Sequence, residues 1–103
     1  MKISNQSGQV ITNQKAIEYI TEFKAQYPDA INSYYVGIDK LQALLSQTNC
    51  IGMRIYPGLN KQTALTNMVL VGVDQKGQDI SDGIILEELI TCPPACSYDN
   101  TLG

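Results

Sequence analysis

The residues with the clearest chemical potential are two cysteines that flank a proline pair, in the stretch Cys92-Pro93-Pro94-Ala95-Cys96. Proline holds its own φ near about −65° and restricts the preceding residue to extended conformations, so the two sulfurs have few separations open to them. Three interpretations stay open: a reversible disulfide, a metal site, and two partly exposed thiols in a rigid tail. A disulfide across so short a loop stabilises a fold by about 2 kcal/mol at most.

Each of the two chemical interpretations of Cys92 and Cys96 lacks a component. Thioredoxin-like redox motifs use C-x-x-C at the N-terminus of a helix, whereas here three residues separate the thiols and no helix is expected after them. Structural zinc takes four ligands, and the chain supplies only one further cysteine, Cys50. A four-thiolate site shared by two copies would complete the set. We predict no cofactor and no resident metal.

The single arginine of the chain, Arg54, lies between Gly52 and Tyr56 on one face of an expected strand. A guanidinium beside a tyrosine could bind a carboxylate or another anion, or stack on the ring. Arg54 and Tyr56 are therefore candidate binding residues. The alternative is an ion pair within the domain or across a dimer contact, because most single surface charges are structural or solvated.

Several enzyme classes lack their usual residues in this chain. It contains no histidine, and so lacks the commonest general base near neutral pH and the usual partner of a serine or cysteine nucleophile. The aspartates between residues 74 and 82 do not match the calcium-loop register. Glu87 and Glu88 are adjacent, so they cannot share one face of a helix or strand. No glycine spacing matches a phosphate-binding loop. We expect a protein that is not an enzyme.

Composition limits the class of partner. The chain has 103 residues, a net charge of −3 and 44% hydrophobic residues, which favours one domain with a modest core. Its seven basic residues stand singly, so neither nucleic acid nor a membrane surface is an expected partner. The N-terminus lacks the apolar stretch of a signal peptide. An odd number of cysteines argues against a secreted disulfide framework. We therefore predict a cytoplasmic protein.

The N-terminal half is predicted to be helical, after a flexible segment over residues 1–11. Thr12 or Asn13 offers an N-cap, and Pro28 ends the helix near Gln26. Residues 30–36 are extended in character, and a second helix spans Asp39–Ser46. Apolar residues recur at helical spacing, which predicts buried stripes in both helices. The stripes comprise Ala16, Ile17, Ile20, Phe23 and Tyr27 in the first helix, and Leu41, Leu44 and Leu45 in the second.

The period of the pattern changes to two from Cys50 onward, which predicts strands. The first strand ends or bends at Pro57-Gly58, and the second spans Leu65–Asp74, so the pair forms an antiparallel hairpin. A third strand could follow from Gln78, and the pattern of residues 84–90 fits either a strand or a short helix. Residues 92–103 form an irregular tail beyond a core of residues 12–91. The predicted fold is α+β, with two N-terminal helices packed on a small antiparallel sheet.

The second strand is apolar on both of its faces over residues 68–73. A strand with one solvated face would alternate between polar and apolar residues, so both faces of this strand must be covered. Either the helices cover one face and a partner chain covers the other, or the strand lies centrally in a covered sheet. Since the chain has few elements, we predict a homodimer with Met68, Leu70 and Val71 at the interface.

Three motifs together resemble those of a family of small uncharacterised bacterial proteins. They are a G-x-R-I-Y strand (Gly52–Tyr56), a V-L-V-G-V-D strand (Val69–Asp74) and a C-P-P-x-C tail (Cys92–Cys96). The resemblance covers the chain from about Thr12. It implies the same order of elements and implies no activity.

The leading hypothesis for function is a non-enzymatic protein-interaction or assembly module that acts as a homo-oligomer. The two-sided apolar strand motivates it. The alternative is a thiol-based redox or metal-binding protein that acts through Cys92 and Cys96.

Overall fold

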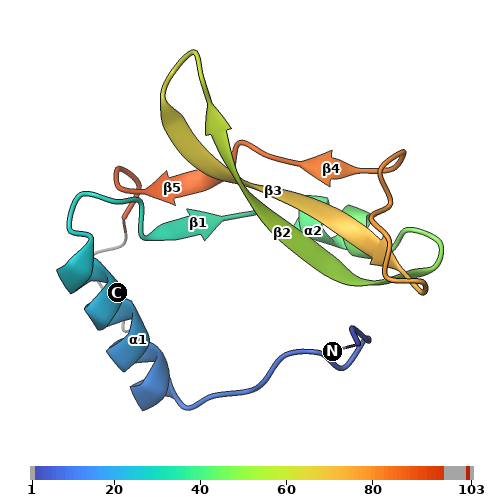
Figure 1. Cartoon of the computed structure of the whole chain (residues 1–103), viewed down its shortest axis with the longest axis horizontal. Helices are drawn as coiled ribbons and strands as arrows, with labels where there is room; N and C mark the ends of the chain where they lie inside the picture. Colours follow the sequence, from blue (N-terminus) through green and yellow to red (C-terminus); the bar gives the residue numbers. More distant parts are fainter. Residues whose placement is uncertain (1, 97–101, 103) are drawn as a thin grey trace. The chain divides into compact units, whose positions relative to one another are not determined.

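An α+β fold is present in the computed structural model of the chain, which describes residues 2–96 and residue 102. Figure 1 shows its elements in sequence colours. In order they are α1 (Asn13–Gln26), β1 (Ser33–Tyr35), α2 (Ile38–Leu45), β2 (Cys50–Asn60), β3 (Leu65–Asp74), β4 (Ile85–Leu86) and β5 (Ile90–Cys92). The chain divides into two compact units, one made of Met1–Ser7 and Tyr35–Leu89, the other of Gly8–Tyr34 and Ile90–Gly103.

The first unit contains an antiparallel sheet in the order β2-β3-β4 (Figure 1). The predicted hairpin is confirmed, with Ile55 opposite Leu70 and Asn60 opposite Leu65. Of the end or bend predicted at Pro57-Gly58, the end is wrong, because β2 continues to Asn60. A proline is tolerated in an edge strand when its missing N–H falls on the unpaired side, and β2 is an edge strand.

The segment after β3 returns along that strand in two short steps. Asp79 forms an isolated bridge with Val73, and Ile85–Leu86 then pairs with Val71 and Leu70 as β4. The predicted third strand is therefore present, although it is interrupted between these two places. The uncertain stretch of residues 84–90 contains β4 and the first residue of β5, and it is not helical.

Helix α2 packs against β2 and β3 in the same unit. Its bounds differ by one residue at each end from the predicted ones. Leu44 is fully buried and Leu41 is half-buried, as expected, but Leu45 is 43% exposed, so its predicted burial is wrong. At 3.6 residues per turn, Leu45 is displaced by about 100° around the helix from Leu44, which carries it off the contact face.

Strand β3 forms the centre of the core. Leu70 is 3% exposed, Val71 4% and Val73 3%. These residues alternate between the two faces of the sheet, so the expectation that both faces of β3 are covered is confirmed. Of the two explanations that the sequence left open, the central position in a covered sheet is the one observed.

The second unit contains α1 and the two-stranded sheet β1-β5. The Thr12 side chain caps α1 by accepting the Lys15 N–H at 3.1 Å, which confirms the predicted N-cap. The expected burial of the apolar stripe is only partly met. Its N-terminal members are half-buried, whereas Phe23 and Tyr27 are exposed and their rings lie 5.1 Å apart. Packing on the β2-β3-β4 sheet was predicted for both helices and is confirmed for α2.

No helix in the described part of the chain combines the length and the apolar character needed to cross a membrane.

Candidate functional site

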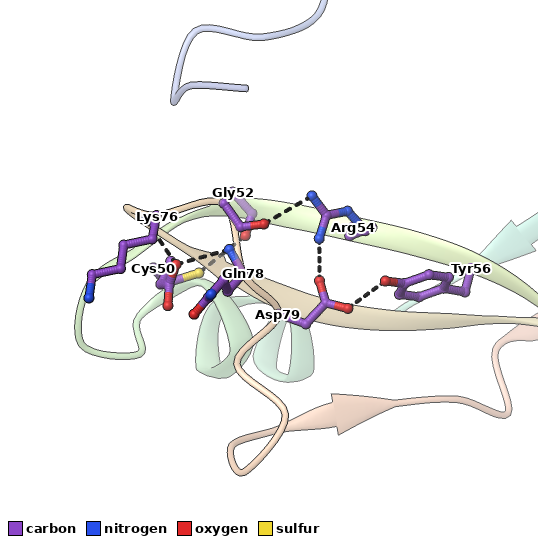
Figure 2. Close-up of polar contacts among 9 residues, drawn as sticks. Cys50, Gly52, Arg54, Tyr56, Lys76, Gln78 and Asp79 are labelled. Atoms are coloured by element: carbon purple, nitrogen blue, oxygen red, sulfur yellow. Dashed lines mark hydrogen bonds and ion pairs between the residues drawn. The ribbon is translucent and has the colours of Figure 1, made fainter. Parts of the chain in front are cut away.

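Asp79 joins the two candidate binding residues Arg54 and Tyr56 (Figure 2). One carboxylate oxygen of Asp79 forms an ion pair with Arg54 Nη1, and the other accepts a hydrogen bond from the Tyr56 hydroxyl. Arg54 and Tyr56 are two residues apart on β2, which places both side chains on one face of the sheet. Arg54 Nη2 also donates to the carbonyl of Gly77 at 3.3 Å.

A tight turn after β3 delivers Asp79 to this face. Asp74 Oδ1 accepts the N–H groups of Lys76 at 2.9 Å and of Gln78 at 3.0 Å. Gly77 supplies the left-handed conformation that the turn requires, with a φ of 82°. The Gly77 N–H donates to the Asp74 carbonyl at 2.9 Å. The chain then reverses, so that Asp79 lies opposite Val73 and within reach of β2.

The three groups shift one another's protonation. The hydrogen bond from Tyr56, together with the bond and charge of Arg54, lowers the pKa of Asp79 below its usual value. The hydrogen bond to Asp79 is the largest cause that raises the pKa of Tyr56, where Arg54 acts in the opposite direction, and it is also the largest cause that raises the pKa of Arg54. Asp79 is therefore a carboxylate at neutral pH, and the Arg54 charge is balanced inside the chain.

The structure thus supplies the intramolecular partner that the sequence left as an alternative. Asp79 is the residue that sequence reasoning missed in this cluster. Its signal was weak, because Asp79 stands 25 residues from Arg54 and only the strand register brings the two together. The possible third strand from Gln78 indicated that the chain returns to the sheet, but not which later residue would reach Arg54.

A pocket of about 370 Å³ adjoins Arg54 within the first unit. Its wall combines the N-terminal segment with the first half of β2 and one residue of β3. The lining residues are Ile3, Ser4, Asn5, Ser7, Ile51, Gly52, Met53, Arg54, Ile55 and Val73. The N-terminal part of this wall is held by a small turn in which Ser7 Oγ accepts the Ser4 N–H at 2.9 Å. The pocket is therefore bounded by the N-terminal segment on one side and by β2 with Val73 of β3 on the other.

The hydrogen bonds of β3 reveal which backbone groups of β2 point outward. The Gly72 carbonyl accepts from the Ile80 N–H at 2.8 Å, and the Asp74 N–H donates to the Gln78 carbonyl at 2.9 Å. The even-numbered residues of β3 therefore bond away from β2. The N–H and C=O groups of successive residues point to opposite sides of a strand. The odd-numbered residues of β3 therefore form its hydrogen bonds to β2. Their opposite residues on β2 are Gly52, Arg54 and Tyr56.

Met53, Ile55 and Pro57 consequently direct their backbone groups to the open edge of the sheet. Proline has no N–H to donate. Because Pro57 faces the open edge, no hydrogen bond between β2 and β3 is lost there. No strand pairs with this edge among residues 2–96. Ile55 is 54% exposed. An unpaired edge of this kind is a template for the addition of another strand.

The three predicted interface residues do not form a surface. Leu70 and Val71 are buried within a single chain and Met68 is half-buried. The burial that suggested a partner is provided by the chain itself, so these residues lose the basis for that assignment.

Cys92 and Cys96 form a disulfide in the second unit, with their Cα atoms 4.9 Å apart, inside the usual range for such bridges. The Cys92–Pro93 and Pro93–Pro94 peptide bonds are both cis. Cys92 is buried and Cys96 is exposed. The Cys92 carbonyl accepts the Asn32 N–H at 2.8 Å, which ties the end of β5 to the start of β1. Of the three interpretations of this pair, the disulfide is the one observed.

In comparisons with models of protein families, with curated proteins and with solved structures, the chain matched none. The resemblance suggested by the three motifs stays a prediction.

Proposed function

We propose that this protein is a non-enzymatic interaction module that acts as a homo-oligomer. The observation that carries the proposal is the open edge of β2, where Met53 and Ile55 direct backbone donors and acceptors away from the sheet. Water satisfies such groups in a monomer, and a strand from another chain satisfies them in an assembly. The contact surface therefore differs from the one predicted at residues 68–71.

The Arg54–Asp79–Tyr56 cluster supports this function better than it supports catalysis. Both oxygens of Asp79 are engaged, and the Arg54 charge is balanced, so the cluster holds the turn after β3 against β2. A rigid edge strand loses less conformational entropy when a partner binds.

Sedimentation velocity on the full chain tests the proposal. We expect self-association as the concentration rises into the high micromolar range. A monomer across that whole range would overturn the homo-oligomer.

The second candidate function is thiol–disulfide exchange at Cys92 and Cys96, and the disulfide itself favours it. The predicted location is the cytoplasm, where disulfides are rare and are usually transient and redox-active. Cys96 is the exposed residue of the pair, so we assign its sulfur as the point of attack. A thiolate of a small dithiol would bond to Cys96 Sγ and release Cys92 as a thiolate that takes up a proton. The second thiol of the reductant would then displace Cys96, which completes a two-electron reduction of this bridge and oxidation of the reductant.

Thiol counting in redox buffers tests the second candidate. Exchange requires that the number of free thiols rise from one to three as a dithiol buffer approaches cytoplasmic potentials. A count that stays at one under those conditions would exclude it.

A further inference from the structure

We propose that the partner at the β2 edge is a second copy of the same strand, paired antiparallel about a two-fold axis at Ile55. This inference rests on the proposed function and adds the contact surface and its register. The two sheets would join into one continuous sheet, with β2 of each copy at the centre.

The backbone permits this pairing. With the axis at Ile55, the two Ile55 residues are directly opposite, and both direct their N–H and C=O groups outward, so they exchange both hydrogen bonds. Each Met53 then lies opposite the partner's Pro57. The Met53 N–H donates to the carbonyl of the partner's Pro57. Proline is the acceptor in this bond, so its missing N–H is not needed. Each Met53 carbonyl remains for water.

Charge selects this register over its neighbours. With the axis at Arg54, two arginines would lie directly opposite, and like charges across a strand pair are unfavourable. With the axis at Tyr56, the two tyrosines would bring together the Asp79 carboxylates that they bind. The axis at Ile55 places Arg54 opposite the partner's Tyr56, where a guanidinium can contact the ring and the carboxylate beside it.

Two further registers fail for backbone reasons. An axis at Met53 draws Ile51 into the pairing, and the β2 ladder is irregular between Cys50 and Gly52, which disrupts a regular ladder. An axis at Pro57 places two prolines opposite each other, and that pair has no donor.

The other face of the joined sheet also favours Ile55 at the axis. Ile55 is 54% exposed in the single chain, and its side chain would meet that of the partner's Ile55. Apolar β-branched residues directly opposite on one face stabilise a strand pair.

Cysteine cross-linking tests the register. In a Cys50→Ser background, mild oxidation of Ile55→Cys should convert most of the chain to a covalent dimer. Ile85→Cys is the matched control, because Ile85 is 52% exposed and lies on β4 at the opposite edge. It should remain largely uncross-linked at the same concentration.

A mixed experiment sharpens the test. Met53→Cys and Pro57→Cys should each cross-link poorly alone, whereas their equimolar mixture should give a covalent heterodimer, because these positions are opposite only across the two-fold axis. Sedimentation of the reduced variants confirms that they still associate.

The outcomes separate the two proposals. Self-association of the wild-type chain without cross-linking at Ile55 would overturn the β2 register and leave the interaction module standing. Cross-linking that is equal at Ile55 and Ile85 would also overturn the register, since it reports random collision. A wild-type chain that stays monomeric would overturn both.

Discussion

The hydroxyl of Tyr56 donates to the carboxylate of Asp79, 23 residues further along the chain. Between them lie the rest of β2, the hairpin loop, all of β3 and the turn at residues 74–78. This contact, with the adjacent ion pair from Arg54, ties the segment that precedes β4 to the edge strand of the same sheet. The two side chains of β2 with the clearest binding potential therefore contact a carboxylate of the same chain.

Acid should weaken the fold through Asp79. Because the folded-state pKa of Asp79 lies below its usual value of 3.8, its contribution is present above that pH and is lost as pH falls through the folded-state value. Urea unfolding from pH 6 to about pH 2.5 should therefore show a smaller acid-side fall in the midpoint for Asp79→Asn than for wild type. Asp82→Asn, which changes an exposed carboxyl in the same segment, should follow wild type. Identical pH profiles for all three proteins would contradict the role of Asp79.

Tyr56 and Asp79 should act as one unit. Tyr56→Phe keeps the ring and removes only the donor, so it should lower the urea midpoint near pH 7. The same change made in an Asp79→Asn background should have much less effect, because the carboxylate acceptor is already gone. Additive effects in this double-mutant cycle would show that the hydroxyl acts elsewhere.

The buried face of α2 should be sharply defined. Leu44 has no exposed surface, so Leu44→Ala should reduce the free energy of unfolding by about 2–5 kcal/mol. Leu45 is the neighbouring residue and is 43% exposed, so Leu45→Ala should cost well under half as much. Chemical denaturation of both variants measures the difference, and equal losses would refute the assignment of the contact face.

A charge on the open edge of β2 should prevent self-association. Ile55→Lys places an ammonium where the sheet would continue, and charged residues on edge strands oppose pairing. Ile85→Lys introduces the same charge at a site of nearly equal exposure on β4. We expect sedimentation to give a monomer for the first variant and wild-type behaviour for the second. Association that survives Ile55→Lys would move the interface elsewhere.

Loss of the disulfide should destabilise the chain only modestly. A loop as short as Cys92–Cys96 contributes about 2 kcal/mol at most through the unfolded state. Cys92→Ser and Cys96→Ser should therefore both fold, with midpoints slightly below that of wild type. A variant that fails to fold would assign the bridge a structural role greater than loop closure provides.

Local features of the fold were predictable because they depend on neighbours in sequence. Thr12 caps α1 because its hydroxyl reaches an N–H three residues away. The hairpin follows from two strand patterns joined by a short polar loop. The strand prediction failed at Pro57, where the outcome depends on which side of β2 is paired.

The candidate site was predictable only in part. Arg54 and Tyr56 stood out by residue type and spacing, and their placement on one strand face is what period-two alternation dictates. Their partner Asp79 depended on how far the chain travels before it returns, which no local pattern encodes. The same limit applied to Met68, Leu70 and Val71. Their apolar character correctly predicted a covered strand, but the sequence assigned the covering to another chain.

By itself, the sequence determined the α+β class, the cap of α1, the hairpin of β2 and β3, and the need to cover both faces of β3. Only the tertiary structure decided what covers that strand, which carboxylate neutralises Arg54 and which edge of the sheet stays open. The physical reason is range: propensity, capping and alternation act over a few residues, whereas coverage and pairing depend on contacts between residues far apart in the chain.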